Sequence, residues 1–357
     1  MSSHRVALFS SLAVFGLLST ADAQDQDRNA PRAVARNLDN PTGIAIHPRT
    51  GNIFVADRTG VTRFSRGERG QVGRRRMQRA AEITGFPSDI YGKGPMFDIG
   101  PLGLAFLDDE HLIVADGSRK DVDELILVYD IEDDAPEQPA QADSAEYTLG
   151  PLGPNDEGQA EGNYYAVAVT GGAIFATANG DDTKGWIVKS ELTDGEPGEL
   201  KRAIATKEAV NVDAPVALTV NKDGDLVVGQ MGEINVPGDA LLSIYDPKSG
   251  ELKHNWETGL NDITGLAYSP TTGKLYATDF CWMDTAEGGL FELTIKDDPV
   301  ETRKAAPLDK PTAIASHAPR TANTRRLLRP SPSVVVQKPG SSSNDFSKAM
   351  FSLLLKY

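Results

Sequence analysis

The chain has 357 residues, a net charge of −15, 34 glycines and 22 prolines. A uniformly acidic protein is repelled by phosphate groups, so the composition argues against nucleic acid or an anionic lipid surface as a partner. Cys281 is the one cysteine in the sequence, so an internal disulfide is impossible. We therefore expect the fold to be held together by buried apolar surface and by closure of its sheets.

Residues 1–23 are predicted to be a signal peptide. A short basic start precedes the apolar run VALFSSLAVFGLLST, which is followed by the small-residue triplet ADA. We expect cleavage after Ala23 and a secreted or periplasmic protein without membrane insertion once the signal is removed; an uncleaved anchor is the alternative. Residues 24–31 are predicted to be a flexible N-terminus.

Residues 32–357 are predicted to repeat one unit of short strands. Each unit starts with a short apolar strand and a tight turn rich in Gly, Asp or Pro, and two further strands follow. A fourth β-like run leads into the next unit. The first strand recurs as TGIAIHP (42–48), LGLAFLD (102–108), YAVAVTG (165–171), VALTVNK (216–222), TGLAYSP (264–270) and TAIASHA (312–318).

The unit length predicts the fold class. Units recur roughly every 50 to 60 residues, which suits a four-stranded antiparallel sheet with longer loops. The runs are short and rich in Val, Ile, Leu, Tyr and Phe, as expected of strands in a buried stack. The sequence therefore predicts an all-β chain, a six-bladed β-propeller.

The ends of the repeat predict how the ring closes. A fourth-strand run precedes every unit, and its first copy, RAVARNL (32–38), has no sheet of its own. The last unit ends on a third-strand run, MFSLLLKY (350–357). We therefore predict that the N-terminal strand closes the last blade and removes an exposed edge. Residues 316–357 are basic and lack the expected turn, so they form a degenerate last blade, an irregular tail or a segment read in a shifted frame.

The polar residue that ends each second strand provides the candidate site. Repeat equivalence predicts that these residues lie at similar height around the channel mouth, where they could hydrogen-bond a polar ligand. Oxygen ligands also suit calcium, and Asp279 and Asp116 are the candidate metal ligands. The alternative is that each residue caps its own strand end through an Asx-type turn. The five positions are Asp57, Asp116, Asn179, Gln230 and Asp279.

The loop DFCWMDTAEGG (279–289) adds a second candidate. Trp282 and Met283 in a loop suggest an apolar lid or a partner-contact patch, with packing over the face of the propeller as the alternative. The basic run at 65–79 could grip a polyanion, although a solvated loop is the simpler interpretation.

The phrase NPTGIAIHPRTGNIFVAD (40–57) resembles NHL-type repeats, and the chain is also similar to the six-bladed SMP-30/gluconolactonase-like propellers. In SMP-30-like lactonases a calcium ion is held by an early glutamate, by asparagines at first-strand entries and by an aspartate after a second strand. Asp279 matches that aspartate. Thr264 stands where an asparagine is expected, and an early matching glutamate is missing.

Two main functions follow from these patterns. We expect an exported binding or interaction module that holds an unknown small molecule or protein at the channel mouth, without a cofactor. The alternative is a calcium-dependent lactonase or esterase of the SMP-30 type. A third interpretation is a structural interaction protein of the cell envelope.

Overall fold

Short strands make up nearly all the regular structure. The computed structural model describes residues 32–69, 75–91, 96–120, 122–159, 162–179, 184–296, 299–317, 333–337 and 352–356, all within the unit Pro31–Tyr357. Helix α2 (Thr206–Val210) is the one α-helix in these ranges. No helix in these ranges is long and apolar enough to cross a membrane. The predicted signal peptide 1–23 and the segment 24–31 lie outside the described residues.

The first two sheets, or blades, are formed in chain order. Blade 1 consists of β2 (Ile44–Ile46), β3 (Ile53–Asp57), β4 (Gly60–Arg69) and β5 (Arg75–Thr84). Its outer edge is extended by the parallel strand β11 (Ala140–Gln141). Blade 2 consists of β8 (Pro101–Phe106), β9 (His111–Asp116), β10 (Ile126–Asp130) and β12 (Tyr147–Leu149).

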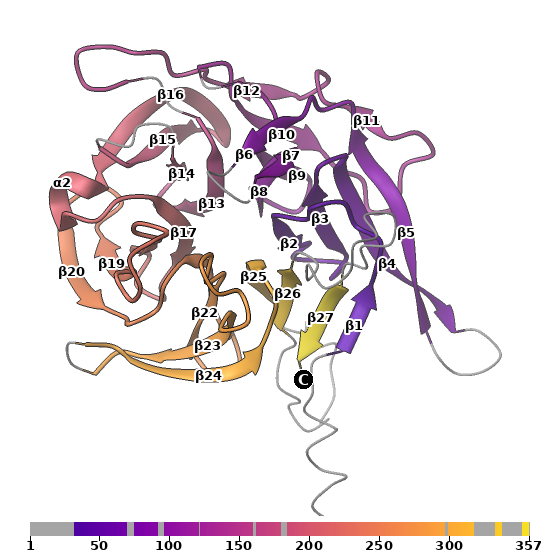
Figure 1. Cartoon of the computed structure of the whole chain (residues 1–357). Coiled ribbons are helices and arrows are strands. Elements are labelled where there is room, and N and C mark those ends of the chain that lie inside the picture. Colours follow the sequence, from indigo (N-terminus) through magenta and orange to yellow (C-terminus); the bar gives the residue numbers. More distant parts are fainter. Residues whose placement is uncertain are drawn as a thin grey trace, which may run out of the picture. The chain divides into compact units, whose positions relative to one another are not determined.

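Three further antiparallel blades continue around a common axis (Figure 1). Blade 3 consists of β13 (Tyr164–Thr170), β14 (Ala173–Ala178), β15 (Trp186–Thr193) and β16 (Glu196–Ala205). Blade 4 consists of β17 (Pro215–Val220), β18 (Leu226–Gln230), β19 (Leu241–Tyr245) and β20 (Leu252–Glu257). Blade 5 consists of β21 (Ile263–Tyr268), β22 (Leu275–Asp279), β23 (Gly289–Thr294) and β24 (Glu301–Pro307).

The structure shows five blades, and the predicted number of six is wrong for the blades that the described residues build. The strand β25 (Pro311–Ser316) follows blade 5, but the turn expected after it is absent and the chain becomes basic and rich in Ser and Pro. Most of the residues linking it to β26 (Ser333–Gln337) and β27 (Ser352–Lys356) lie outside the described ranges. Closure by β1 (Arg32–Ala35) stays a prediction.

The core lies between neighbouring blades, because each blade presents one face to the blade before it and the other to the blade after it. The second strands are therefore buried on both faces; all five residues of β3 and all five of β18 are buried. Phe54, Leu112 and Tyr129 belong to one apolar cluster that joins blades 1 and 2. Equivalent clusters join blades 2 and 3, 3 and 4, and 4 and 5. This double burial explains why the second strands appear as continuous apolar runs in the sequence.

Adjacent first strands approach closely at a waist of the central channel. A Cβ on Gly43 would lie 1.8 Å from the Leu102 carbonyl oxygen, and one on Gly103 would lie 2.6 Å from that of Tyr165. Five first strands have a register shift at the equivalent point: β8, β13, β17, β21 and β25. A β-bulge of this kind changes the direction in which the side chain at that position points.

Threonine hydroxyls bridge the first strands at this waist. Thr42 Oγ1 donates to the Pro101 carbonyl (2.9 Å), and Thr264 Oγ1 donates to that of Pro311 (2.7 Å). Thr312 Oγ1, in β25, donates to the carbonyl of Pro41 (3.0 Å), 271 residues earlier in the chain. The three threonines occupy the same position of the repeat in their units, and each bond joins its unit to the next one around the axis.

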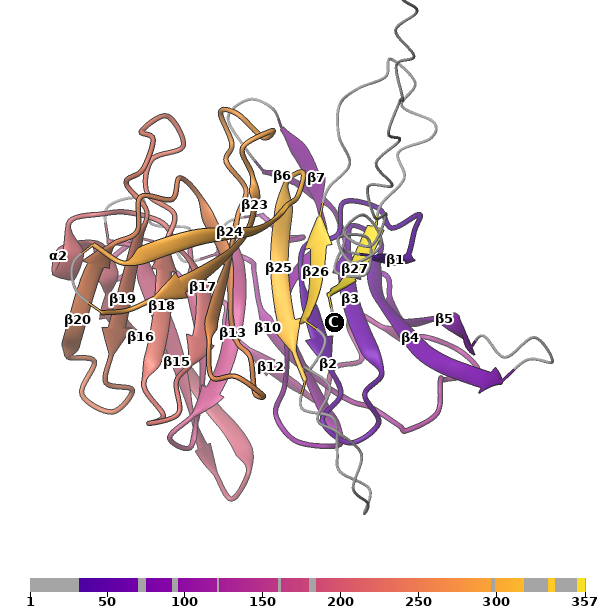
Figure 2. The same ribbon diagram turned by 90° about the horizontal axis from the view of Figure 1, so that it is seen from below.

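A hairpin that the repeat does not predict lies between blades 1 and 2. Its strands are β6 (Asp89–Tyr91) and β7 (Phe97–Ile99), and they form a separate two-stranded sheet. Figure 2 shows the hairpin toward the same end of the axis as α2. We call this end the site face, and we call the opposite end, where the turns between first and second strands lie, the turn face.

Candidate functional site

The central channel is divided at the waist. From the turn face, a cavity of about 910 Å³ extends along the first strands and is lined mainly by aliphatic residues such as Ile44, Leu104 and Ile314. At the waist Tyr165 donates its hydroxyl hydrogen to the Thr312 carbonyl (3.0 Å). Burial raises the pKa of Tyr165 far above its usual value, so it stays a neutral donor. Tyr165 also lines a second, very small cavity of about 30 Å³ on the site-face side of the waist.

Aromatic rings cover that small cavity. Phe280 and Trp282 stack with ring centres 4.9 Å apart, and Phe97 of the hairpin packs edge-on against Trp282 at 5.6 Å. Tyr91 of the same hairpin packs edge-on against Trp282 at 6.2 Å. Rings in these arrangements attract one another beyond the gain from burial alone. The hairpin and the loop after β22 therefore form one lid over the axis.

A cleft of about 640 Å³ lies on the site face beside this lid. Its walls come from the hairpin (Asp89–Tyr91), from the segment 213–214 that enters blade 4, from the loop 231–235, and from Trp282 and Met283. The volume falls in the range of roughly 300–1,000 Å³ that is typical of small-molecule sites. The cleft combines rings, aliphatic side chains and a few polar groups, as such sites usually do.

Apolar side chains are exposed at the cleft. Ile90 and Met283 line it and have 59% and 68% of their surface exposed. Met96 of the hairpin is 68% exposed, and Val236, which follows the loop 231–235, is 45% exposed. Single exposed apolar residues are ordinary, but a group of them beside a concave surface indicates a binding region.

Polar groups in the cleft are held in place by hydrogen bonds and ion pairs. The Asn179 Nδ2 donates to the Tyr91 hydroxyl (3.0 Å) and joins blade 3 to the hairpin. The ammonium of Lys207, in α2, contacts a carboxylate oxygen of Asp213 at 2.7 Å. Glu233 is exposed on the loop after β18. A ligand in the cleft could therefore form hydrogen bonds or ion pairs with these groups.

Of the five ring positions proposed from the sequence, Asn179 lines this cleft. Asp279 accepts backbone N–H bonds from Asn261 (3.1 Å), Asp262 (2.8 Å) and Cys281 (3.1 Å). Asp57 likewise accepts from the backbone N–H groups of Asp39 (3.3 Å) and Thr59 (2.9 Å). Both aspartates accept the N–H two residues later and the N–H 18 residues earlier, so they cap equivalent strand ends in the same way.

Asp116 and Gln230 are also engaged by their own surroundings. Asp116 Oδ1 accepts the Ser118 N–H (2.8 Å) and Oδ2 lies 3.0 Å from Arg119 Nε. Burial raises the pKa of Asp116. Gln230 Nε2 donates to Thr206 Oγ1 (3.0 Å) and to the Val212 carbonyl (2.8 Å). The strand-capping alternative is thus seen at the aspartates, and a ligand-binding role for the five stays a prediction.

Calcium also stays a prediction. In the part of the chain that the structure describes, no group of three or more His, Cys, Asp or Glu side chains could hold a metal ion. The oxygens of Asp279 already accept three backbone N–H groups, which compete for the lone pairs that a cation would use.

A buried carboxyl group supports the lid from behind. The Asp262 carboxylate accepts the backbone N–H of Trp282, and 2% of Asp262 is exposed. Burial raises the pKa of Asp262 to about 6, and the neighbouring charges of Asp279 and Asp239 act in the same direction. Cys281 lies in the same turn with a φ of 52°; its sulfur accepts from Asn261 Nδ2 (3.1 Å), and burial raises the pKa of the thiol.

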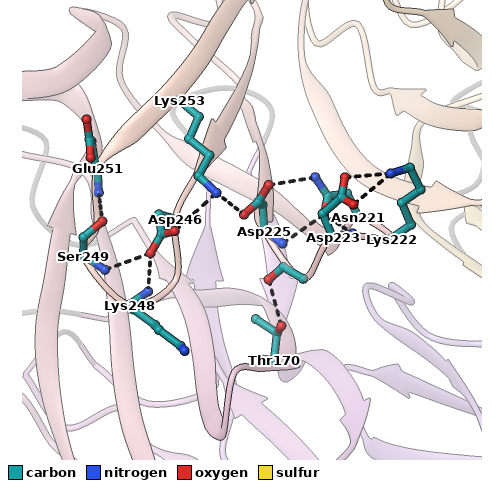
Figure 3. Close-up of polar contacts among 11 residues, drawn as sticks. Thr170, Asn221, Lys222, Asp223, Asp225, Asp246, Lys248, Ser249, Glu251 and Lys253 are labelled. Carbon is teal, nitrogen blue, oxygen red and sulfur yellow. Dashed lines mark hydrogen bonds and ion pairs between the residues drawn. The ribbon is translucent and has the colours of Figure 1, made fainter.

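The turn face has a different chemistry, shown in Figure 3. The ammonium of Lys253 lies between the carboxylates of Asp225 (2.5 Å) and Asp246 (3.2 Å). The side chain of Asp246 also accepts the N–H groups of Lys248 (2.9 Å) and Ser249 (3.0 Å), so it caps its own turn. These contacts are local to the turns of blade 4.

The sequence indicated part of the cleft and missed the rest. Trp282 is 9% exposed and packs against the other rings of the lid, whereas the adjacent Met283 is exposed. A partner-contact patch at this loop stays a prediction. Tyr91, Lys207 and Asp213 were missed because they lie outside the repeat. The signal that could have found the hairpin is the apolar and aromatic insertion FPSDIYGKGPMFDIGP (86–101) between the first two units.

Comparison with known proteins supports the fold. No protein-family model matches the chain. No curated protein matches it. A solved structure titled glucose dehydrogenase has a TM-score of 0.54 and 13% identity over 92% of this chain and 99% of that chain. A luciferin-regenerating enzyme has a TM-score of 0.53 and 10% identity over 91% and 95%.

A third similar structure is the WD40 β-propeller domain of Doa1, with a TM-score of 0.50 and 11% identity over 91% of this chain and 96% of that chain. The fold is a β-propeller. At these identities the likeness establishes the arrangement of the sheets and not the function, because propellers carry many unrelated activities.

Proposed function

We propose that the protein is a binding module whose ligand occupies the site-face cleft at the mouth of the channel. The observation that carries the proposal is the cleft of about 640 Å³ beside the aromatic lid, with Ile90 and Met283 exposed in it. The cleft combines exposed apolar side chains with polar groups, and small-molecule sites also combine apolar surface with polar groups that fix the orientation of the ligand.

The cleft is a better candidate than the larger channel cavity. The channel wall is formed by equivalent first-strand residues, which the repeat requires for packing, and Tyr165 blocks it at the waist. The cleft is formed by the hairpin and by loops that differ from blade to blade. Variable loops on a rigid scaffold are the usual location of specific binding groups.

We propose further that a sixth blade completes the ring and that the N-terminal strand closes it. The strand order β1-β27-β26-β25 supports this, as does the pairing of β1 with β27. The bond from Thr312 to Pro41 independently joins β25 to the segment before blade 1. Deleting residues 32–38 tests the proposal, because the open ring is expected to unfold at lower denaturant than the full chain.

Export and an NHL or SMP-30 relationship are parts of the same proposal. They rest on the leader-like residues 1–23 and on the phrase at 40–57. Sequencing the N-terminus of the protein from its native host tests export, since a mature chain starting at Gln24 is expected.

A calcium-dependent lactonase or esterase is the alternative, favoured by the match of Asp279 to the family aspartate. Metal analysis of the purified protein tests it together with lactone hydrolysis before and after chelation. One tightly held calcium ion and activity abolished by the chelator would replace the binding-module proposal with this one.

The binding proposal is tested with a library of small neutral aromatic compounds by ligand-observed NMR. We expect several to bind competitively and to lose binding at least 5-fold in Met283→Asp, because a carboxylate would enter an apolar wall. Ile295→Asp is the matched control, since Ile295 is 36% exposed and does not line the cleft. Hits that respond equally to both variants, or the absence of hits, would contradict the proposal.

A further inference from the structure

We propose that the ligand of the site-face cleft is an organic cation: an apolar or aromatic body that carries a positively charged amine. This inference rests on the proposed function and adds the charge of the ligand to it. The described cleft lining has three carboxylates and one ammonium group, and the carboxylates belong to three separate walls.

The charges of the lining favour a cation and disfavour an anion. Asp89 comes from the hairpin, Asp213 from the segment that enters blade 4, and Glu233 from the loop after β18. Lys207 is the one basic side chain in the described lining. Asp213 lies 2.7 Å from its ammonium, so these two charges offset each other and the remaining charge of the wall is that of Asp89 and Glu233.

An anionic ligand would therefore meet the carboxylates of Asp89 and Glu233, neither of which forms an ion pair with another described residue, and to reach Lys207 it would have to displace Asp213. A cationic ligand needs no such exchange. A further carboxylate lies next to this wall: Asp239 accepts the Glu233 N–H (3.0 Å). Its negative charge also favours a cation in the cleft. The whole chain is also acidic, with a net charge of −15, so a diffusing cation is attracted and an anion is repelled.

The apolar groups of the cleft suit the other part of such a ligand. Tyr91 and Trp282 line it from the lid, and the faces of aromatic rings attract a nearby ammonium group. Ile90 and Met283 offer exposed apolar surface to an aliphatic or aromatic body. The carboxylates of the walls would bind the amine of such a ligand, and the rings and exposed apolar side chains would bind its apolar body.

Three probes of similar size separate charge from shape: 2-phenylethylammonium, 2-phenylethanol and phenylacetate. Their affinities for the full chain are measured by titration calorimetry at low and high salt. We expect 2-phenylethylammonium to bind at least 10-fold more tightly than phenylacetate and about 5-fold more tightly than 2-phenylethanol. The advantage of the cation is expected to shrink at high salt, because ions screen exposed charges.

The double variant Asp89→Asn/Glu233→Gln tests the residues. It is expected to abolish the advantage of the cation and to leave the affinity for 2-phenylethanol unchanged. Glu251→Gln, on the turn face, is the matched control and is expected to change neither affinity.

The outcomes separate this inference from the proposed function. If 2-phenylethanol binds in the cleft and the ammonium binds no better, the inference is overturned and the binding module stands. If phenylacetate binds most tightly, the inference is also overturned. If none of the three probes binds, both the inference and the proposed cleft are contradicted.

Discussion

The two ends of the channel axis are formed by the same repeat and differ in chemistry. At the turn face, carboxylates such as Asp246 cap their own turns and pair with lysines. At the site face, the strand-end aspartates are equally occupied, but an inserted hairpin and longer loops leave Ile90 and Met283 exposed beside a cleft. The comparison teaches that the repeat supplies stability at both ends, and that the segments outside the repeat supply the candidate function at one.

The largest expected effect comes from removing a strand-end aspartate. Asp279→Ala leaves three backbone N–H groups without their acceptor: those of Asp262 and Cys281, which are buried, and that of Asn261, which is partly buried. Such losses cost about 1 kcal/mol or more each, so we expect a decrease of about 3 kcal/mol in the free energy of unfolding. Urea denaturation measures it, with the exposed Asp223→Ala as control. A loss below about 1 kcal/mol would contradict the capping role.

The repeat explains how much of this structure could be predicted. The strands follow from alternating and apolar runs, because every second strand is buried on both faces and so has to be apolar. The Asx capping by Asp57 and Asp279 follows from their place at strand ends, and the sequence predicts it as the alternative to ligand binding.

The cleft could not be predicted in the same way. Tyr91, Lys207 and Trp282 come from the hairpin, from α2 and from the loop after β22, and they meet only because the ring brings these segments together. Contacts between segments that are distant in the sequence produce no repeating pattern from which they could be predicted. The count of six blades was also wrong, because it rested on six copies of the first strand, and the last copy, TAIASHA (312–318), is not followed by the turn that continues the other units.

The second expected effect concerns the carboxyl group behind the lid. Burial raises the pKa of Asp262 from 3.8 to about 6, so the folded state holds this proton more tightly than the unfolded state does. Its stabilising contribution is complete below pH about 4 and is lost as the pH rises through about 6. Asp262→Asn stays neutral and can still accept from Trp282, so we expect a gain of about 2 kcal/mol at pH 7.5 and little change at pH 4.

Urea denaturation of the wild type and of Asp262→Asn at both pH values measures this difference. An equal effect at the two pH values would show that Asp262 is not the titrating group.

A smaller effect is expected at the waist that separates the two ends. Tyr165→Phe removes the hydrogen bond to the Thr312 carbonyl and keeps the ring in place. We expect a loss of about 1 kcal/mol in the free energy of unfolding. Tyr268→Phe, in the same channel, is the control. A variant as stable as the wild type would show that the bond across the axis contributes nothing.

The smallest effect is expected at the turn face. Lys253→Met removes the cation between Asp225 and Asp246, but all three groups are near solvent, where ion pairs contribute little. Hydrogen bonds and Lys253 lower the pKa of both aspartates, so their contribution is present at neutral pH and lost as the pH falls through those lowered values. Calorimetry at pH 7 is expected to show that the Tm of Lys253→Met differs from that of the wild type by less than about 2 °C. A larger decrease would show that these ion pairs contribute substantially to the stability of the fold.

The central claim is that the site-face cleft, and not the channel cavity, receives the ligand. A crystal structure of the protein soaked with 2-phenylethanol tests it most directly. We expect electron density for the compound between the hairpin and the loop 231–235, in contact with Met283. Density in the channel on the turn-face side of Tyr165, with an empty cleft, would contradict it.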